Sequence, residues 1–348
     1  MSTMSRLPAI AIVIAAWPLA VPAALGQPFP SKPVRIIVPF VPGGGTDAFA
    51  RIVGTKVSAT WDQQIIVENR GGAQGNIGTA LGAKAAPDGY TITLAYVGTL
   101  AINPHLYAKL AYDTLRDFAP VTQMVSIGFV LCVNPSLPVR SVPELVKLAK
   151  ERPGEISFGS TGNGATNHIA QSLFASMMGI KLIHVPYKGA VPSLTDLIGG
   201  QISMLAETTP LVLPHLKAGK IRAIGVFSIK RSHFLPDVPT LDEQGVKGFD
   251  MNTWTGLVAP AGTPPAILER MNNEAVKALK TPEVQKRLNE LGFVGVANSR
   301  EQFGAYIKSE LARWAAAVKI SGARVESAAC ACIWGTHSSS AIRRGPCL

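Results

Sequence analysis

The chain has 348 residues, of which 47% are hydrophobic and 16% are charged, so it has room for two domains with large apolar cores. Its formal net charge is +11 at pH 7, but its Lys and Arg residues are spread singly rather than in blocks. This distribution argues against a nucleic-acid partner, because such partners select clustered basic residues. The basic balance favours encounters with small anions instead.

The first 26 residues have the pattern of a cleaved signal peptide. A single cation, Arg6, precedes an apolar run from about Ala9 to Ala20, and Ala24-Leu25-Gly26 offers small residues for cleavage. Pro18 and Pro22 interrupt this stretch, which falls short of the ~20 residues that a membrane span needs. An uncleaved membrane anchor is the alternative. The pattern predicts a mature protein in the periplasm.

Strand and helix patterns alternate in the first third of the chain. With short connections, this alternation predicts an α/β fold whose sheet is parallel or mostly parallel, with helices on both faces. The predicted elements are strand Val34–Phe40, helix Thr46–Thr60, strand Gln64–Val67, a helix that ends near Ala86, and strand Thr91–Tyr96.

A second alternating block begins at Val142. Its predicted elements are helix Val142–Lys150, strand Glu155–Phe158, helix Asn167–Met178, strand Leu182–Val185, helix Val191–Ile198, strand Gln201–Leu205 and strand Ile221–Phe227. A strand at Trp254 follows, and then helices Ala266–Lys280, Pro282–Leu291 and Arg300–Ile320.

Two extended apolar segments, around 128–133 and 250–257, are candidate crossings between two lobes. We therefore predict a discontinuous lobe 1 formed by residues 27–128 and 253–326, and a lobe 2 formed by residues 129–252. Residues 327–348 lack periodicity and are predicted to be a disordered tail. The tail holds Cys330, Cys332 and Cys347, whose spacing to His337 matches no zinc pattern, so we expect no metal site.

Four glycine-rich turns, at residues 40–47, 69–76, 159–168 and 186–190, follow predicted strands. In open α/β sheets ligands bind beyond the carboxyl ends of strands, and bare N–H groups at a helix start favour an anion. Asp47, in the first turn of its helix, would repel a polyanion, so one small carboxylate fits better than a pyrophosphate. Micromolar binding needs about 8 kcal/mol, more than one such turn supplies, so we expect donors from both lobes.

The same residues also allow two enzymatic interpretations. Gly43–Gly45 followed by Thr46-Asp47-Ala48 fits a dinucleotide-binding fingerprint, with Glu68 at the distance expected for a ribose contact. Ser160 and His168 could meet across a helix start, but no Gly-x-Ser-x-Gly elbow surrounds the serine. We predict no catalytic residues and no cofactor, and the exported dinucleotide enzyme remains the alternative.

The chain resembles the Bug/TctC family, the extracytoplasmic solute receptors of tripartite tricarboxylate transporters. The resemblance runs from about Pro30 to Glu326 and is carried by blocks such as PFVPGGGTDAFAR, VENRGGAQGNIGT, HVPYKGAVPSLTDLIGGQI and APAGTPP. It implies a two-lobed type II periplasmic-binding-protein fold that closes on a small carboxylate. The implied carboxylates are di- or tricarboxylates, amino acids or aromatic acids. The implied partner is a membrane permease, and the receptor is expected to be a monomer.

The resemblance also implies which residues bind the ligand. Glu207 stands where family members often carry Asp, and it could meet a ligand ammonium or hydroxyl. The ligand-binding residues carried over by position are Phe40, Gly43, Gly44, Gly45, Asp47, Gly72, Ala73, Gly75 and Thr99 in lobe 1, with Ser160, Thr161, Gly164, Thr166, His168, Tyr187, Lys188, Gly189 and Glu207 in lobe 2.

Overall fold

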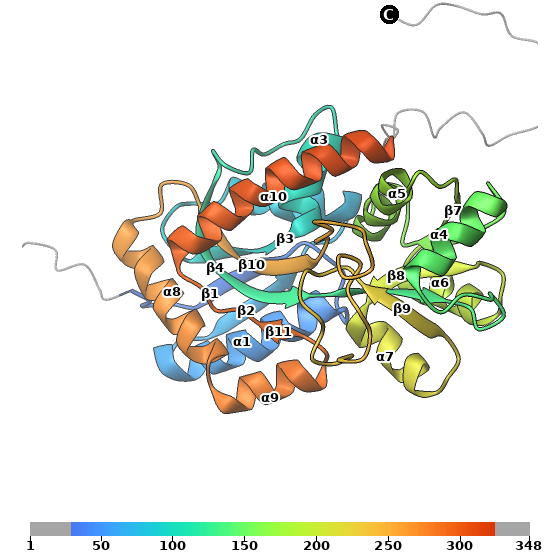
Figure 1. The fold of residues 1–348 in the computed structure, drawn as a ribbon. Coiled ribbons are helices and arrows are strands. Elements are labelled where there is room, and N and C mark those ends of the chain that lie inside the picture. Colours follow the sequence, from blue (N-terminus) through green and yellow to red (C-terminus); the bar gives the residue numbers. More distant parts are fainter. Residues whose placement is uncertain (1–28, 324–348) are drawn as a thin grey trace, which may run out of the picture.

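The computed structural model describes residues 29–323 and contains two lobes, each built on one β-sheet with helices packed against it (Figure 1). The predicted signal peptide and the predicted tail, with its three cysteines, lie outside the described residues. Within 29–323, no helix is both long enough and apolar enough to span a bilayer.

Lobe 1 carries a six-stranded sheet in the order β11-β4-β10-β3-β1-β2. Its strands are β1 (Val34–Val38), β2 (Ile65–Asn69), β3 (Thr91–Tyr96), β4 (Phe118–Ile127), β10 (Thr253–Pro260) and β11 (Val294–Gly295). Its helices are α1 (Gly45–Trp61), α2 (Asn76–Ala83), α3 (Asn103–Leu106), α8 (Pro265–Leu279), α9 (Pro282–Glu290) and α10 (Arg300–Ser321), with a short 3-10 turn at Ala73–Gly75 and a π-helix at Gly98–Ile102.

Lobe 2 carries a five-stranded sheet in the order β7-β6-β8-β5-β9. Its strands are β5 (Phe129–Val133), β6 (Ser157–Ser160), β7 (Ile183–Pro186), β8 (Met204–Thr208) and β9 (Arg222–Val226). Its helices are α4 (Val142–Glu151), α5 (Thr166–Met178), α6 (Ala190–Ile198) and α7 (Thr209–Lys217).

The α/β class is confirmed, but both sheets are mixed rather than mostly parallel. Strands β1, β2 and β3 pair in parallel, as do β7, β6 and β8. All antiparallel pairs involve β4, β5 or β10. These three strands lie next to the passages between the lobes. Their direction is set by the path of the chain between the two sheets and not by a βαβ crossover.

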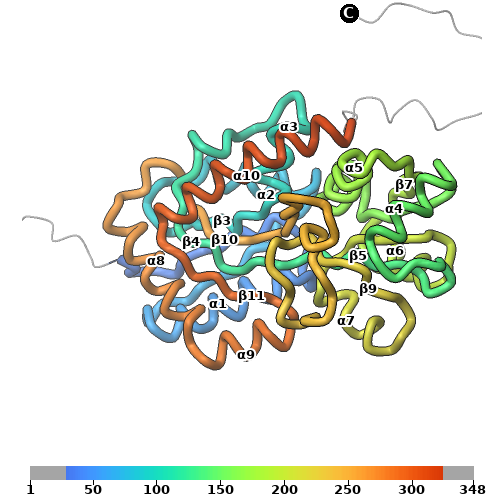
Figure 2. The backbone as a smooth tube through the Cα atoms, viewed as in Figure 1, coloured from blue at the N-terminus to red at the C-terminus, as the bar shows by residue number. Residues whose placement is uncertain are grey.

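The chain passes between the two sheets twice. It leaves the first sheet at Gly128, between β4 and β5, and returns after β9 to enter β10, as Figure 2 shows in the change from teal through yellow to orange. The passages are neighbours, because Ile127 pairs with Thr253 in the β4–β10 ladder. We propose that the lobes divide at these two passages, as the sequence predicts.

The apolar core runs through the passages without a break. Phe129 and Leu131 of β5 belong to the same buried cluster as Trp254 of β10 and Phe303 of α10. Glu310 of α10 is buried beside them and accepts hydrogen bonds from the indoles of Trp254 (2.9 Å) and Trp314 (3.0 Å). This packing holds α10 against the returning strand.

Several segments differ from the predicted elements, among them α3, β11 and the π-helix, which were not predicted. Strand β4 and helix α7 were not predicted, because Pro120 and Pro210 with Pro214 break the local periodicity. Strand β8 lies three residues later than the predicted strand Gln201–Leu205, which places Glu207 within the strand instead of after it.

Candidate functional site

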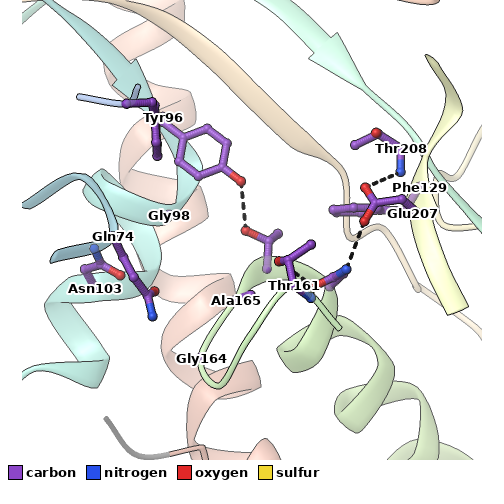
Figure 3. Close-up of a pocket in the computed structure, with 13 residues that line it drawn as sticks. Gln74, Tyr96, Gly98, Asn103, Phe129, Thr161, Gly164, Ala165, Glu207 and Thr208 are labelled. Carbon is purple, nitrogen blue, oxygen red and sulfur yellow. Dashed lines mark hydrogen bonds between the residues drawn. The ribbon is translucent and has the colours of Figure 1, made fainter. Parts of the chain in front are cut away.

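A cavity of about 260 Å³ lies between the lobes and takes its walls from both (Figure 3). Its residues come from the ends of β1 and β3, the Gly72–Gly75 turn, the π-helix and the start of α3 on lobe 1, and from β5, β8, the loop between β6 and α5 and the start of α5 on lobe 2. The lining residues are Phe40, Gln74, Tyr96, Gly98 and Asn103 from lobe 1, with Phe129, Thr161, Gly164, Ala165, Thr166, Asn167, Glu207 and Thr208 from lobe 2.

On lobe 1, the wall is formed by two aromatic rings that follow buried strands. Phe40 lies two residues after the end of β1 and meets Tyr96, the last residue of β3, edge to face with ring centroids 5.2 Å apart. Strands β1 and β3 are parallel neighbours, so their carboxyl ends bring the two rings to the same edge of the sheet. This edge is where ligands of α/β proteins bind.

Four consecutive residues with positive φ form the turn between β2 and α2. Their φ angles are 122° at Gly72, 46° at Ala73, 53° at Gln74 and 91° at Gly75. The two non-glycine residues each store roughly 1–2 kcal/mol of backbone strain. The turn projects Gln74 toward the other lobe, and its Nε2 donates to the carbonyl of Asn163 at 3.2 Å.

A second contact crosses between the lobes through Tyr96. Its hydroxyl lies 3.3 Å from Oγ1 of Thr166, the first residue of α5. Together with the Gln74–Asn163 hydrogen bond, this pair holds the two walls of the cavity together. The described conformation is therefore one in which the lobes are in contact over the cavity.

On lobe 2, Asn167 connects the start of α5 to strand β8. Its Oδ1 accepts from the backbone N–H and the hydroxyl of Thr161, both at 3.2 Å, which fixes the orientation of the amide. Its Nδ2 therefore faces β8 and donates to the carbonyl of Ala206 and to Oε2 of Glu207, both at 3.2 Å. The start of α5 and the carboxylate of Glu207 on β8 therefore lie next to each other.

Glu207 is the one charged side chain among the residues that line the cavity. It is 4% exposed, and its Oε1 accepts from the backbone N–H of Thr208 at 2.8 Å. Burial raises the pKa of Glu207, while the hydrogen bonds from Thr208 and Asn167 oppose that rise. The cavity thus combines neutral donors, aromatic walls and one buried acid.

Five of the residues predicted to bind ligand line this cavity: Phe40, Thr161, Gly164, Thr166 and Glu207. The other predicted residues lie around or behind it. Gly43, Gly44, Gly45 and Lys188 are exposed, while Gly72, Ala73 and Gly75 carry the turn that presents Gln74. Thr99 is buried in the π-helix, and Gly189 precedes α6. Their roles as ligand contacts stay predictions.

Asp47 organises the first glycine turn. Its carboxylate accepts from the N–H of Gly43 at 3.1 Å and from Nδ2 of Asn69 at 3.0 Å, and it pairs with Arg51. Burial acts to raise the pKa of Asp47, but the bonds from Arg51, Gly43 and Asn69 outweigh burial and lower it. The residue therefore shapes the loop from behind and does not line the cavity.

Ser160 and His168 do not form a catalytic pair. Ser160 is 0% exposed, and its hydroxyl contacts Nε2 of His184 at 2.6 Å. His168 stacks on His184 with ring centroids 3.8 Å apart, and its Nδ1 accepts from the N–H of Gly164 at 3.1 Å. Burial, with a smaller contribution from His184, lowers the pKa of His168 to about 4. These side chains support the loop that carries Gly164.

Tyr187 is likewise turned away from the cavity, because its hydroxyl donates to Asp196 at 2.7 Å. The dinucleotide alternative is not favoured: Glu68 pairs with Arg35 and Arg70 on the sheet, and Gly43–Gly45 are outside the cavity lining. Among residues 29–323, no cluster of His, Cys, Asp and Glu has the composition of a metal site.

Eight lining residues were not among the predicted ligand contacts. Three of them, Gln74, Gly98 and Ala165, fell within the segments 72–75, 97–99 and 160–166 that the resemblance assigned to the site. For Tyr96, its place at the end of a predicted strand was an available signal. The residues missed altogether are Tyr96, Asn103, Phe129, Asn167 and Thr208.

Comparison with known proteins supports this description of the fold. The family described as "Tripartite tricarboxylate transporter family receptor" matches residues 49–322 of the chain. Protein BugT of Bordetella pertussis is 36% identical over 325 residues, which are 93% of this chain and 99% of BugT.

Two solved structures are also similar over most of their length. "R. palustris Rpa4515 with adipate" has a TM-score of 0.76 at 34% identity, and the match covers 85% of this chain and 99% of that one. "Structure of periplasmic binding protein BugD" has a TM-score of 0.73 at 34% identity, with the same coverage.

Proposed function

Since the chain belongs to the tripartite tricarboxylate transporter receptor family, we propose that it is a solute-binding protein that captures a small carboxylate between its lobes. The observation that carries the proposal is the cavity lined by both lobes and bridged by Gln74–Asn163 and Tyr96–Thr166. The adipate bound to the similar Rpa4515 supports a carboxylate as the ligand class.

We propose further that the receptor works in the periplasm as a monomer and delivers its ligand to a membrane permease. The leader pattern of residues 1–26 and the similarity to the periplasmic BugD support the location. A purely binding role is supported by the buried state of Ser160 and by the use of His168 as a loop support. The predicted ligand residues of both lobes, including those behind the lining, remain part of this proposal.

A thermal-shift panel of organic acids tests the proposed function. A ligand that binds only the folded protein at 100 times its Kd adds about 2.7 kcal/mol to the free energy of unfolding. For a protein of this size we expect a rise in Tm of about 5 °C or more with at least one carboxylate. The panel should include dicarboxylates, tricarboxylates, amino acids and aromatic acids, with NAD as a separate arm. Stabilisation by NAD alone would contradict the proposal.

The two hydrogen bonds that cross the cavity, Gln74–Asn163 and Tyr96–Thr166, are expected to slow release of whichever carboxylate the panel identifies. Gln74→Ala and Tyr96→Phe each remove one hydrogen bond, which is worth about 1 kcal/mol, so each variant should release ligand roughly fivefold faster. Stopped-flow measurement of the release rate checks this. Gln64→Ala, at an exposed position of lobe 1, is the control. Unchanged release rates in both variants would show that these contacts do not hold the closed form.

A further inference from the structure

Helix α2 packs against the first sheet through its small residues. Its buried residues are Gly78, Thr79 and Gly82. A Cβ at Gly82 would overlap Oγ1 of Thr93 on β3. A Cβ at Gly78 would lie 2.7 Å from Cα of Pro39, next to β1. The glycines therefore bring the helix against the sheet without any contribution from its large side chains.

The two large apolar residues of α2, Ile77 and Leu81, face away from the sheet. They lie one turn apart and are 51% and 46% exposed. Together with Tyr107 and Leu110 of the segment after α3, they line a groove of about 440 Å³. Single exposed apolar side chains are ordinary, but a groove that collects several of them marks a site of interaction.

The groove carries positive charge beside its apolar wall. Lys84, directly after α2, and Lys109 line the groove and are exposed, and no Asp or Glu lines it. Among the ion pairs within residues 29–323, none includes either lysine. This surface is complementary to an amphipathic helix that has Asp or Glu beside its apolar face.

Charge argues against two other occupants of the groove. A second copy of the chain, placed face to face in a symmetric pair, would bring Lys84 and Lys109 against the same two lysines. The chain's own residues 324–348 contain three Arg and one Glu, so their charge has the same sign as that of the groove. An acidic helix of another protein fits better than either.

The groove and the cavity between the lobes share one wall. Ala73 lines the groove, and the next residue, Gln74, lines the cavity (Figure 3). Gln74 also donates to Asn163 of lobe 2. Asn76 lines the groove and accepts from Nδ2 of Asn103, another cavity residue, at 2.6 Å. A partner in the groove would therefore touch the turn that joins the two lobes over the cavity.

We infer that this groove is a docking surface for an acidic amphipathic helix of the membrane permease. The inference rests on the proposed function, in which the permease is the protein that takes the ligand from the cavity. Ile77 and Leu81 pack against the apolar face of the helix, and Lys84 and Lys109 pair with its acidic side chains. Exposed ion pairs are individually weak, so the apolar contact supplies most of the affinity and the charges select the partner.

Photo-crosslinking in intact cells of the native host tests the docking surface. The full protein carries p-benzoylphenylalanine in place of Leu81 or, as the control, in place of Ile229, which is 47% exposed in the segment after β9. The Leu81 position is expected to form an adduct with an integral membrane protein, and sequencing of the adduct should place it in an amphipathic segment rich in Asp or Glu. The Ile229 position should form little of this adduct.

Charge reversal at the groove tests the chemistry of recognition. Lys84→Glu combined with Lys109→Glu should lower the yield of the adduct by about fivefold or more. Lys277→Glu combined with Lys280→Glu, at exposed lysines of α8 and its end, changes the net charge equally and should leave the yield unchanged. If the groove variant folds poorly, Lys84→Gln with Lys109→Gln removes the same charges and should lower the yield by about half or more.

The outcomes separate this inference from the proposed function. An adduct with lipid, with a second copy of the chain or with a segment that lacks acidic residues would overturn the docking surface. A yield that is unchanged by charge reversal would do the same. A protein that binds a carboxylate in the thermal-shift panel but forms no adduct at Leu81 would overturn the docking surface alone. A permease adduct in a protein that binds no acid would overturn the proposed ligand alone.

Discussion

Lowering the pH from 7.5 to 4.5 is expected to cost the protein about 2–3 kcal/mol of its free energy of unfolding through His168 alone. The pKa of His168 in the folded protein is about 4, below its ordinary value of 6.5. The unfolded chain therefore binds a proton that the folded protein excludes between these two values. Stability from this group is fully present above pH 6.5 and is lost as the pH falls toward 4.

The loss has a structural cause that reaches the cavity. Nδ1 of His168 accepts the N–H of Gly164, so protonation at Nδ1 removes the acceptor and places a cation against His184, whose own pKa burial also lowers. Because Gly164 lines the cavity, ligand affinity should fall over the same pH range.

Urea unfolding at the two pH values measures this effect. His168→Asn offers an amide oxygen in place of Nδ1 and does not titrate. Between pH 7.5 and 4.5, the free energy of unfolding of this variant should therefore fall by about 2–3 kcal/mol less than that of the native protein. His105→Asn, an exposed histidine on α3, should keep the native dependence. If the free energy of unfolding changed equally with pH in the native protein and in His168→Asn, the assignment of the pH dependence to the His168 ring would be contradicted.

Gly78→Ala is expected to lower the free energy of unfolding by about 2–3 kcal/mol and to weaken ligand binding. A Cβ at Gly78 would lie 2.5 Å from the carbonyl oxygen of Arg70 and 2.7 Å from Cα of Pro39. Both are backbone atoms, so helix α2 would have to move away from the end of β1. That movement displaces Phe40 on one side and the Gly72–Gly75 turn with Gln74 on the other.

Thermal unfolding and ligand titration of the same variant check both parts. Gly304→Ala places a methyl group in helix α10, where the nearest atom is Cγ of Pro120 at 3.3 Å. A side-chain neighbour can shift, and removing a helical glycine gains up to about 1 kcal/mol, so this control should be neutral or slightly stabilising. A Gly78→Ala protein with native Tm would show that α2 is not held as closely as the structure indicates.

The sequence predicted the parts of the site that follow a local pattern. Phe40, Thr161 and Thr166 stand in glycine-rich turns after strands, where a ligand is expected in an α/β fold. Glu207 was selected through the family resemblance and not through a local pattern, and the strand that contains it was placed three residues early. These choices needed no knowledge of how distant segments meet.

The missed residues depend on contacts between distant parts of the chain. Gln74 and Asn163 are 89 positions apart, and Tyr96 and Thr166 are 70 apart, so no periodicity brings either pair together. Conversely, Tyr187 is polar and stands within the predicted turn at residues 186–190, but its hydroxyl donates to Asp196 in the following helix. A local pattern identifies hydrogen-bond donors, but it does not show which of them are already bonded to other groups of the protein.

The position of β10 sets the order in which the lobes can be completed during synthesis. All strands of the second sheet lie within residues 129–226, so that sheet can assemble before the last third of the chain has been made. The first sheet cannot, because β10 is inserted between β3 and β4 and arrives more than a hundred residues after them. Until then β3 has one unpaired edge and β4 has two, because its other partner, β11, follows β10 in the chain, and such edges are the surfaces that misassociate in a growing chain. The lobe that begins the chain is therefore the last to finish folding.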